Sequence, residues 1–452
     1  MADSDVALTV AGSDSGGGAG IQADLKTMES LGVFGTSAVT SLTAQNSTGV
    51  RGVHDAPPEF VADQIDAVVE DFDVEVVKTG MLSNAETARV VADKIDEHGL
   101  TAVVDPVMVA QSGDRLLSRD AEMVVSDELL PDATLVTPNA PEAETLTGVT
   151  VDSSESMKEA ARELVDAGSD AALVTGGHIS EGDVVDVLAD EDGTTEYTKP
   201  RVEGGATHGT GCAFSSAVAA ELAKGASLRE AVGSAEAFIY RAVRYGVDVG
   251  EGADSVHHLV HLRNDAALTG AVNAVRDALA RLDEVDGFPR LLPEVGTNVA
   301  VATPYALEQD EVAAVDGRIR RATDGFVASC VRLGASGHAA RYLLALRDEL
   351  NDEPGTACNL RNDDAVRDAL ETTDLNVVHI DRSEQPDETR EGEGGTMEWS
   401  AHTAASLSEE RDAFPDAVVD AGAVGKEPMV RLAARDAHEL VERVERIADA
   451  LE

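Results

Sequence analysis

Cysteine is scarce in this chain of 452 residues, which contains only Cys212, Cys330 and Cys358. An odd number of widely separated cysteines, with no C-x-x-C pair among them, predicts neither a disulfide framework nor a structural zinc site. We therefore expect the protein to work in a reducing compartment.

Long apolar runs are also lacking. No stretch of about 18 consecutive apolar residues occurs, which argues against a membrane-spanning helix. The N-terminal sequence MADSDVALTV is acidic, and its apolar stretch is too short for a signal peptide. These absences predict a soluble cytoplasmic protein that does not bind a membrane.

Positive charge is the third shortage, because 35 lysine and arginine residues face 85 aspartate and glutamate residues, for a formal net charge of −50. Such a charge repels a phosphate backbone, so we expect no nucleic-acid partner. It also destabilises a compact chain in dilute buffer, whereas at about 1 M salt the Debye length is only ~3 Å and the repulsion is screened. The composition therefore points to a salt-rich cytoplasm. Because the charges are interspersed, a solvated acidic surface is favoured over an acidic partner-binding tail.

Hydrophobic residues make up 43% of the chain, whose length exceeds the roughly 250 to 300 residues at which one core stops growing. Two or more globular domains are expected. From Val6 to about Gly246, short strand patterns such as Val74–Val77 alternate with helix-period segments. This alternation predicts an α/β domain built on a parallel sheet.

A domain boundary is expected between Gly246 and Leu268, where the alternation lapses before a fresh amphipathic helix begins near Thr269. The boundary divides the chain into residues 1–262 and 263–452. The second part reads as a smaller α/β domain with expected strands at Asn298–Ala302, Val327–Val331, Leu375–Ile380 and Asp416–Val419. The polar, glycine-rich segment Ser383–Gly395 is expected to be a loop.

Two glycine motifs carry the chemistry of the first domain. The string AGSDSGGGAGIQADLKT, Ala11 to Thr27, follows the first strand, and its glycines let the backbone approach a ligand closely. Taken alone, this string is equally consistent with a tight turn. The string THGTGC, Thr207 to Cys212, opens a helix that is predicted over Ala213 to Lys224, so its backbone N–H groups and the positive helix end should bind an anion.

Cys212 lies at the start of that helix, where a thiol pKa is expected to fall below ~8.5 and a thiolate can act as a base. The alternative is that Cys212 is a small buried packing residue. The glycine context favours the functional interpretation.

The first domain resembles the hydroxymethylpyrimidine/phosphomethylpyrimidine kinases, a branch of the ribokinase-like superfamily. The resemblance covers residues 5 to about 260 and rests on both glycine motifs and on the strings AQN at Ala44–Asn46, KTGM at Lys78–Met81, VDPVM at Val104–Met108, SGD at Ser112–Asp114, TPNAPEAE at Thr137–Glu144 and GGH at Gly176–His178. It implies a three-layer α/β/α fold with a mainly parallel sheet. It also implies two successive phosphorylations of 4-amino-5-hydroxymethyl-2-methylpyrimidine with ATP and Mg²⁺ at one site.

The family pattern implies a role for each matching residue. The pyrimidine pocket is expected to be lined by Gly12, Asp24, Gln45, Met81 and Val107. A flat aminopyrimidine needs apolar walls, and the amide of Gln45 matches an amine beside a ring nitrogen. Gln45 and Asp24 could instead be surface polar residues.

Phosphoryl transfer depends mainly on positioning and charge neutralisation, so the site needs fixed donors and Mg²⁺. The anion hole is assigned to Gly209, Gly211 and Cys212. The ATP site is assigned to Asn139, Thr175, Gly177, Thr210 and Gly211, and the metal sphere to Asp105 and Glu142 with Asn139 nearby. Thr175 stands where many relatives carry a lysine before GGH, which makes the nucleotide contacts less secure.

The second domain resembles the archaeal-type thiamine-phosphate synthase domain. The matching strings are PEVGTNVAVATPYA at Pro293–Ala306, GRIRR at Gly317–Arg321, GASGHAAR at Gly334–Arg341, GGTMEW at Gly394–Trp399 and VGKEPMVRL at Val424–Leu432. The resemblance implies condensation of the pyrimidine diphosphate with a thiazole phosphate to thiamine phosphate, with release of pyrophosphate. Arg320, Arg321 and Lys426 are expected to clamp phosphates, and His338 to position or protonate one.

Alternatives remain at this point. His338 could be a structural histidine, and the second domain could be a non-catalytic thiamine-phosphate sensor, although no basic patch or DNA-binding segment accompanies it. The first domain could phosphorylate pyridoxal instead. We expect the partners to be small-molecule substrates and further copies of the same chain in a homo-oligomer.

Overall fold

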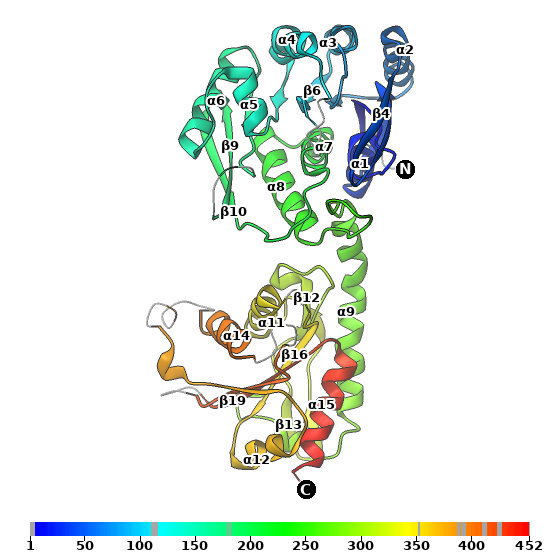
Figure 1. Cartoon of the computed structure of the whole chain (residues 1–452). Coiled ribbons are helices and arrows are strands. Elements are labelled where there is room, and N and C mark those ends of the chain that lie inside the picture. The colour runs from blue at the N-terminus through cyan, green and yellow to red at the C-terminus, as the bar shows by residue number, and fades with distance from the viewer. Residues whose placement is uncertain are drawn as a thin grey trace. The chain divides into compact units, whose positions relative to one another are not determined.

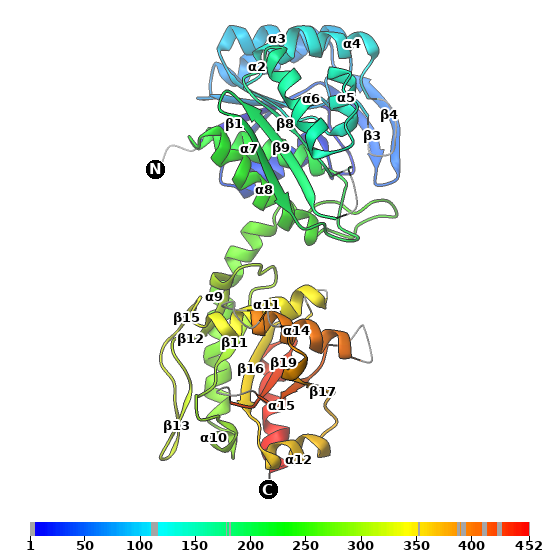
Figure 2. The ribbon, with the colours of Figure 1, turned by 90° about the vertical axis from the view of Figure 1, so that its left-hand side faces the viewer.

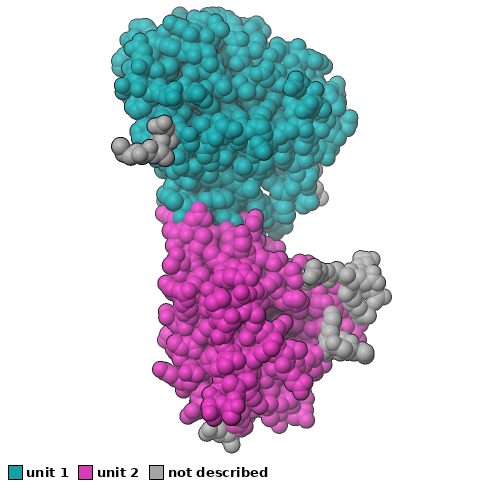
Figure 3. Space-filling view, turned by 180° about the vertical axis from the view of Figure 1, so that it is seen from behind, with its two compact units in different colours: residues 1–262 teal, residues 263–452 magenta. Residues whose placement is uncertain are grey.

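The computed structural model describes residues 5–109, 116–177, 179, 182–350, 353–386, 389, 395–408, 414–422 and 427–451. The chain forms two compact units, Met1–Leu262 and Arg263–Glu452, which Figure 3 distinguishes by colour. Among the described helices, none combines the length and apolar character that crossing a bilayer requires.

The first unit is built on an eight-stranded sheet in the order β10-β9-β8-β7-β6-β5-β1-β2. Its strands are β1 Val6–Ala11, β2 Phe34–Val39, β5 Val76–Thr79, β6 Thr101–Val104, β7 Leu135–Val136, β8 Ala172–Val174, β9 Val184–Asp190 and β10 Gly193–Lys199. All neighbouring pairs from β2 to β8 are parallel, whereas β9 pairs antiparallel with both β8 and β10. The mainly parallel sheet confirms the predicted fold class.

Helices cover both faces of this sheet, which gives the three-layer α/β/α arrangement (Figures 1 and 2). On one face lie α2 Pro58–Val69, α3 Ala85–His98, α4 Arg119–Val124, α5 Ala140–Thr147 and α6 Ser154–Asp166, whose apolar residues join the strands in one core. On the other face lie α1 Gly20–Ser30, α7 Thr210–Ala223 and α8 Leu228–Arg244. A separate hairpin, β3 Ser41–Asn46 with β4 Gly49–Asp55, follows β2.

The second unit contains a seven-stranded sheet in the order β15-β12-β11-β16-β19-β18-β17. Its strands are β11 Val299–Ala302, β12 Val312–Val315, β15 Val331–Leu333, β16 Thr356–Arg361, β17 Val377–Ile380, β18 Ala417–Asp420 and β19 Met429–Ala434. Among the described strands of this sheet, only β17 and β18 pair in parallel. The unit is α/β as predicted, with a largely antiparallel sheet.

Helices again cover both faces of the second sheet. Helices α11 Gly337–Glu349 and α14 Gly395–Leu407 lie side by side on one face (Figures 1 and 2). The other face is covered by α9 Val260–Leu282, α10 Phe288–Leu291, α12 Asp364–Thr372 and α15 Ala437–Asp449, which share a core with the strands. A two-stranded hairpin, β13 Arg320–Ala322 and β14 Gly325–Val327, stands apart from the sheet.

Two predicted element boundaries are wrong. Helix α9 begins at Val260, nine residues before the expected start near Thr269. A tertiary contact explains this, because the His261 ring stacks on Phe238 of α8 with ring centroids 5.2 Å apart. The expected strand Val327–Val331 is also split, since Val327 ends the β13–β14 hairpin and Val331 begins β15 beside β12.

Candidate functional site

The carboxyl edge of the first sheet gathers most of the predicted site residues. Parallel strands place their carboxyl ends at one edge, where α/β proteins bind ligands. Gly12 follows β1, Met81 follows β5, Asp105 and Val107 follow β6, and Asn139 follows β7. Thr175 and Gly177 follow β8 at the same edge. Order along the chain and parallel pairing are therefore enough to bring these residues to one edge.

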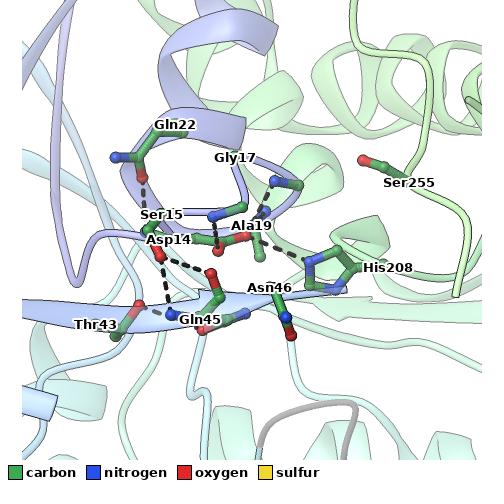
Figure 4. A network of polar contacts seen from close by, with 12 residues as sticks. Asp14, Ser15, Gly17, Ala19, Gln22, Thr43, Gln45, Asn46, His208 and Ser255 are labelled. Atoms are coloured by element: carbon green, nitrogen blue, oxygen red, sulfur yellow. Dashed lines mark hydrogen bonds and ion pairs between the residues drawn. The ribbon is translucent and has the colours of Figure 1, made fainter. Parts of the chain in front are cut away.

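The first glycine loop is organised by the carboxylate of Asp14, as Figure 4 shows. Its Oδ1 accepts the N–H of Gly16 at 2.8 Å, and its Oδ2 accepts those of Gly18 at 3.0 Å and Ala19 at 2.8 Å. The Nε2 atom of His208 lies 3.3 Å from the same Oδ2. Burial alone would raise the pKa of Asp14, but these bonds outweigh it and hold the pKa below its usual value.

His208 belongs to the second glycine motif, so its contact with Asp14 joins the two loops. Helix α7 begins at Thr210, three residues before the expected start at Ala213, and its N-cap is Gly209 with φ +82°. A Cβ at Gly209 would lie 1.8 Å from the carbonyl oxygen of Gly18. Glycine is therefore required at position 209 both by the left-handed backbone and by the close approach of the loops.

A buried lysine lies beneath the site. The Nζ atom of Lys78 is 3.0 Å from Oδ1 of Asp24 and 3.7 Å from Oδ2 of Asp105, and all three side chains are almost fully buried. Burial alone would lower the pKa of Lys78, but the neighbouring carboxylates outweigh it and raise the pKa. The ammonium therefore stays charged and holds the two carboxylates in place.

Both carboxylate oxygens of Asp24 are used inside the protein. Besides Lys78, Asp24 accepts hydrogen bonds from Thr9 at 2.6 Å and from Ser216 on α7 at 2.8 Å. These bonds tie β1, β5 and α7 together. A direct contact between Asp24 and a pyrimidine stays a prediction.

The predicted lowering of the Cys212 pKa is wrong. Burial raises the pKa of the thiol to about 12, and the carboxylates of Asp24 and Asp105 add to the increase. The ammonium of Lys78 and the N–H of Gly20 act in the opposite direction without overcoming burial. The thiol is therefore protonated at neutral pH and does not serve as a ready base.

Asp105 and Glu142 form a pair of buried carboxylates. Burial raises the pKa of Asp105, and burial together with the charge of Asp105 raises that of Glu142 to about 8. A divalent cation would relieve both the burial penalty and the repulsion, so this pair fits a Mg²⁺ sphere. Glu142 also has a structural role, since its carboxylate accepts the N–H of Asn139 in a capping box at the start of α5.

The predicted nucleotide residues lie in adjacent loops. Asn139 and Thr175 form an isolated parallel bridge beyond the ends of β7 and β8. Nη1 of Arg201 donates to the carbonyl oxygen of Gly177 at 3.1 Å, which holds that loop. Residue His178 of the GGH string and the SGD string at Ser112–Asp114 lie outside the described residues.

The other residues predicted to line the pyrimidine pocket lie in three places near the carboxyl edge of the sheet. Gly12 and Met81 are in direct proximity, because a Cβ at Gly12 would lie 2.3 Å from Cε of Met81. Gln45 lies on β3 near the first glycine loop, where its backbone N–H donates to Oγ of Ser15 at 2.8 Å. Val107 is half-buried after β6. The carboxyl edge thus offers apolar walls beside the two glycine loops.

In the second unit the predicted phosphate clamp is only partly described. His338 occupies the first turn of α11, as predicted, and is exposed. Arg320 and Arg321 lie on the exposed β13 hairpin, where Nε of Arg321 donates to the carbonyl oxygen of Pro289 at 2.6 Å. Lys426 lies outside the described residues. Their convergence on one ligand stays a prediction.

A buried ionic cluster in this unit was missed by the sequence analysis. Both Arg382, just after β17, and Arg431, on β19, donate to the carboxylate of Asp420 at the end of β18. The side chain of Asp420 is fully buried, and each arginine side chain is 7% exposed. Arg431 lies inside the string VGKEPMVRL, which was the available signal. Lys426, from the same string, was assigned to the phosphate clamp instead.

Comparison with known proteins identifies both units. The phosphomethylpyrimidine kinase family model matches residues 14–257, and the model of thiamine-phosphate synthase ThiN matches residues 274–446. The bifunctional thiamine biosynthesis protein ThiED of Geobacter sulfurreducens is 52% identical over 254 residues, covering 56% of this chain and 52% of that protein. The hydroxymethylpyrimidine/phosphomethylpyrimidine kinase of Bacillus subtilis is 46% identical over 260 residues, covering 57% of this chain and 96% of the kinase.

Solved structures agree on the fold of the first unit. An ADP complex of Bacillus subtilis pyridoxal kinase is 35% identical, with a TM-score of 0.54, and covers 57% of this chain and 98% of the kinase. The pyridoxal kinase of Staphylococcus aureus in complex with pyridoxal is 32% identical, also with a TM-score of 0.54, and covers 57% of this chain and 95% of that kinase. The chain belongs to the phosphomethylpyrimidine kinase family and carries a C-terminal domain of the thiamine-phosphate synthase ThiN type.

Proposed function

We propose that the first unit transfers the γ-phosphoryl group of ATP to hydroxymethylpyrimidine and then, at the same site, to the resulting monophosphate. This proposal rests on the contact between the two glycine loops at the start of α7. There, backbone N–H groups and the positive helix end lie beside the carboxyl ends of β5 and β6. A transferring phosphoryl group needs such fixed donors more than it needs a strong base.

In each step the acceptor oxygen bonds to the γ-phosphorus, the bond from that phosphorus to the bridging oxygen of ADP breaks, and the acceptor proton is released. Asp105 and Glu142 would hold Mg²⁺, which would neutralise phosphate charge. Met81 and Gly12 form the apolar wall of the acceptor pocket. Cys212 closes the anion hole with a neutral thiol, in keeping with its raised pKa.

For the second unit we propose condensation of the pyrimidine diphosphate with thiazole phosphate. The bond from the pyrimidine methylene carbon to the diphosphate oxygen breaks, a bond from that carbon to the thiazole nitrogen forms, and pyrophosphate leaves. The ThiN match supports this chemistry. The chain is proposed to act in a salt-rich cytoplasm, in keeping with its net charge of −50.

Pyridoxal phosphorylation is the second candidate, because the solved structures with the fold of the first unit include pyridoxal kinases. Steady-state assays with ATP and Mg²⁺ in high salt separate the two. Hydroxymethylpyrimidine should yield two ADP per pyrimidine, with kcat/KM at least about tenfold above that for pyridoxal, or roughly 1.4 kcal/mol of discrimination. A preference for pyridoxal, or one ADP per pyrimidine, would refute the proposal.

A further inference from the structure

The Asp420 cluster lies at the carboxyl ends of β17 and β18, which pair in parallel in the second sheet. Asp420 is the last residue of β18, and Arg382 follows the end of β17 by two residues. Carboxyl ends of parallel strands form the crevice in which α/β sheets bind ligands. The cluster therefore stands at a position suited to a ligand.

The ion pairing within the cluster leaves Arg431 with capacity for an anion. The positive charge of Arg382 alone balances the negative charge of Asp420. Nε of Arg382 lies 2.8 Å from both carboxylate oxygens, and its Nη2 donates to Oδ2. Arg431 adds a second guanidinium on that same Oδ2, at 3.0 Å through Nη1. A buried cation without a carboxylate of its own is costly unless an anion binds it.

The donor groups of Arg431 are only partly used by the protein. Its hydrogen bonds to described residues go from Nη1 to Asp420 and to Oγ of Ser400 on α14 at 3.3 Å. The planar guanidinium carries further N–H donors on Nη2 and Nε. Such a fork suits the oxygens of a phosphate group.

Tyr342 on α11 adds a hydroxyl to the cluster. The guanidinium carbon of Arg431 lies 5.5 Å from the centroid of the Tyr342 ring. Tyr342 is 3% exposed, and its hydroxyl has no hydrogen-bond partner among the described residues. Leaving a buried hydroxyl unpaired destabilises the fold, so the presence of this hydroxyl is explained if a ligand oxygen accepts a hydrogen bond from it.

The sequence motifs of the second unit also meet here. Tyr342 lies one helical turn after His338, Ser400 directly follows the string GGTMEW, and Arg431 belongs to VGKEPMVRL. Arg431 thus lies within one of the motifs that carry the family resemblance, and Tyr342 and Ser400 each directly follow another.

We propose that Arg431 and Tyr342 form a phosphate-binding subsite of the second unit, with Asp420 holding Arg431 in position. The ligand class is a phosphate monoester or diphosphate. This inference rests on the proposed synthase function and assigns that function a site. Thiamine phosphate, thiazole phosphate and inorganic pyrophosphate share the required chemistry, so the test must separate them.

Isothermal titration of the full chain, with the nucleotide site saturated by ADP and Mg²⁺, compares thiamine phosphate with thiamine. Tyr342→Phe should raise the Kd for thiamine phosphate about fivefold, and Arg431→Lys should raise it tenfold or more, with the Kd for thiamine unchanged. Separate titrations with thiazole phosphate and pyrophosphate show which ligand places its phosphate in the subsite, since the variants should bind only that ligand more weakly.

Thr303→Val is the matched control, because Oγ1 of Thr303 is another buried hydroxyl without a partner among the described residues, two strands from β19. Both Tyr342→Phe and Thr303→Val should melt at or above the temperature of the parent chain. Parent-like affinity for thiamine phosphate, thiazole phosphate and pyrophosphate in a folded Tyr342→Phe and in Arg431→Lys would overturn the subsite while leaving the synthase proposal intact. A parent chain that binds none of the phosphorylated ligands would overturn both.

Discussion

At the scale of single residues, Cys212 illustrates how burial competes with a helix N-terminus. Burial raises the pKa of the thiol to about 12, so at pH 7.5 the thiolate is a very small fraction. Iodoacetamide should therefore label the exposed Cys330 at least about 100-fold faster than Cys212, as measured by peptide mass spectrometry. Equal labelling rates would contradict the raised pKa and support the lowered pKa that the helix position alone predicts.

His258 provides a prediction about stability and pH. Burial, with a smaller contribution from Lys26, lowers its pKa from 6.5 to about 4. Between these values the unfolded chain binds a proton that the folded chain does not, so the free energy of unfolding falls as the pH falls, by up to roughly 3 kcal/mol. Above pH 6.5 this loss is absent.

The replacement His258→Phe should remove this contribution to the pH dependence of the free energy of unfolding. Stability at neutral pH should change little, because Nε2 of His258 has no partner among the described residues. Urea unfolding at intervals from pH 4.5 to 7.5 measures the slope, with the exposed His54→Gln as control. An unchanged slope in His258→Phe would contradict the buried neutral histidine.

Residue types and motif order predicted which residues of the first unit lie at one edge of its sheet. Gly12, Met81, Asp105 and Asn139 reach one edge because each follows a parallel strand. The bond between Asp14 and His208 could not be predicted in this way, since it joins residues 194 positions apart through folding alone. The burial of the Cys212 thiol could not be predicted from the sequence either, which is why the direction of its pKa shift was predicted wrongly.

At the scale of elements, the start of α7 depends on Gly209. Gly225, just after the same helix, has a similar φ of +84°, but a Cβ there would meet nothing within 4 Å. Gly225→Ala should therefore cost only the backbone strain of about 1 to 2 kcal/mol. Gly209→Ala adds a clash with Gly18, so its melting temperature should fall further and its kinase activity should be lost. Equal melting temperatures for the two variants would contradict the packing of the loops.

The strands could be predicted where a short, Val-rich run forms a buried parallel strand. Val76–Thr79 and Thr101–Val104 are short and almost fully buried, as Val-rich parallel strands are. The antiparallel β9–β10 pair was not predicted, because strands such as Gly193–Lys199 alternate exposed and half-buried residues at the sheet edge. The start of α9 depended on a ring contact with another helix, which local pattern does not encode.

At the scale of the whole molecule, the net charge of −50 predicts stabilisation by salt. The Debye length falls from ~30 Å at 0.01 M to ~3 Å at 1 M, so repulsion among the acidic residues is progressively screened. Thermal melts in KCl should show a midpoint that rises steeply over this range. A midpoint that stays flat or falls would contradict adaptation to a salt-rich cell.

Two units on one chain imply two activities that act in succession on one pyrimidine. Assigning the kinase to residues 1–262 and the synthase to residues 263–452 stays a prediction until products are measured. The direct measurement incubates the purified full chain in high salt with ATP, Mg²⁺, hydroxymethylpyrimidine and thiazole phosphate, and follows ADP, pyrophosphate and thiamine phosphate. The account predicts two ADP and one pyrophosphate for each thiamine phosphate formed. Accumulation of the pyrimidine diphosphate without pyrophosphate or thiamine phosphate would contradict it.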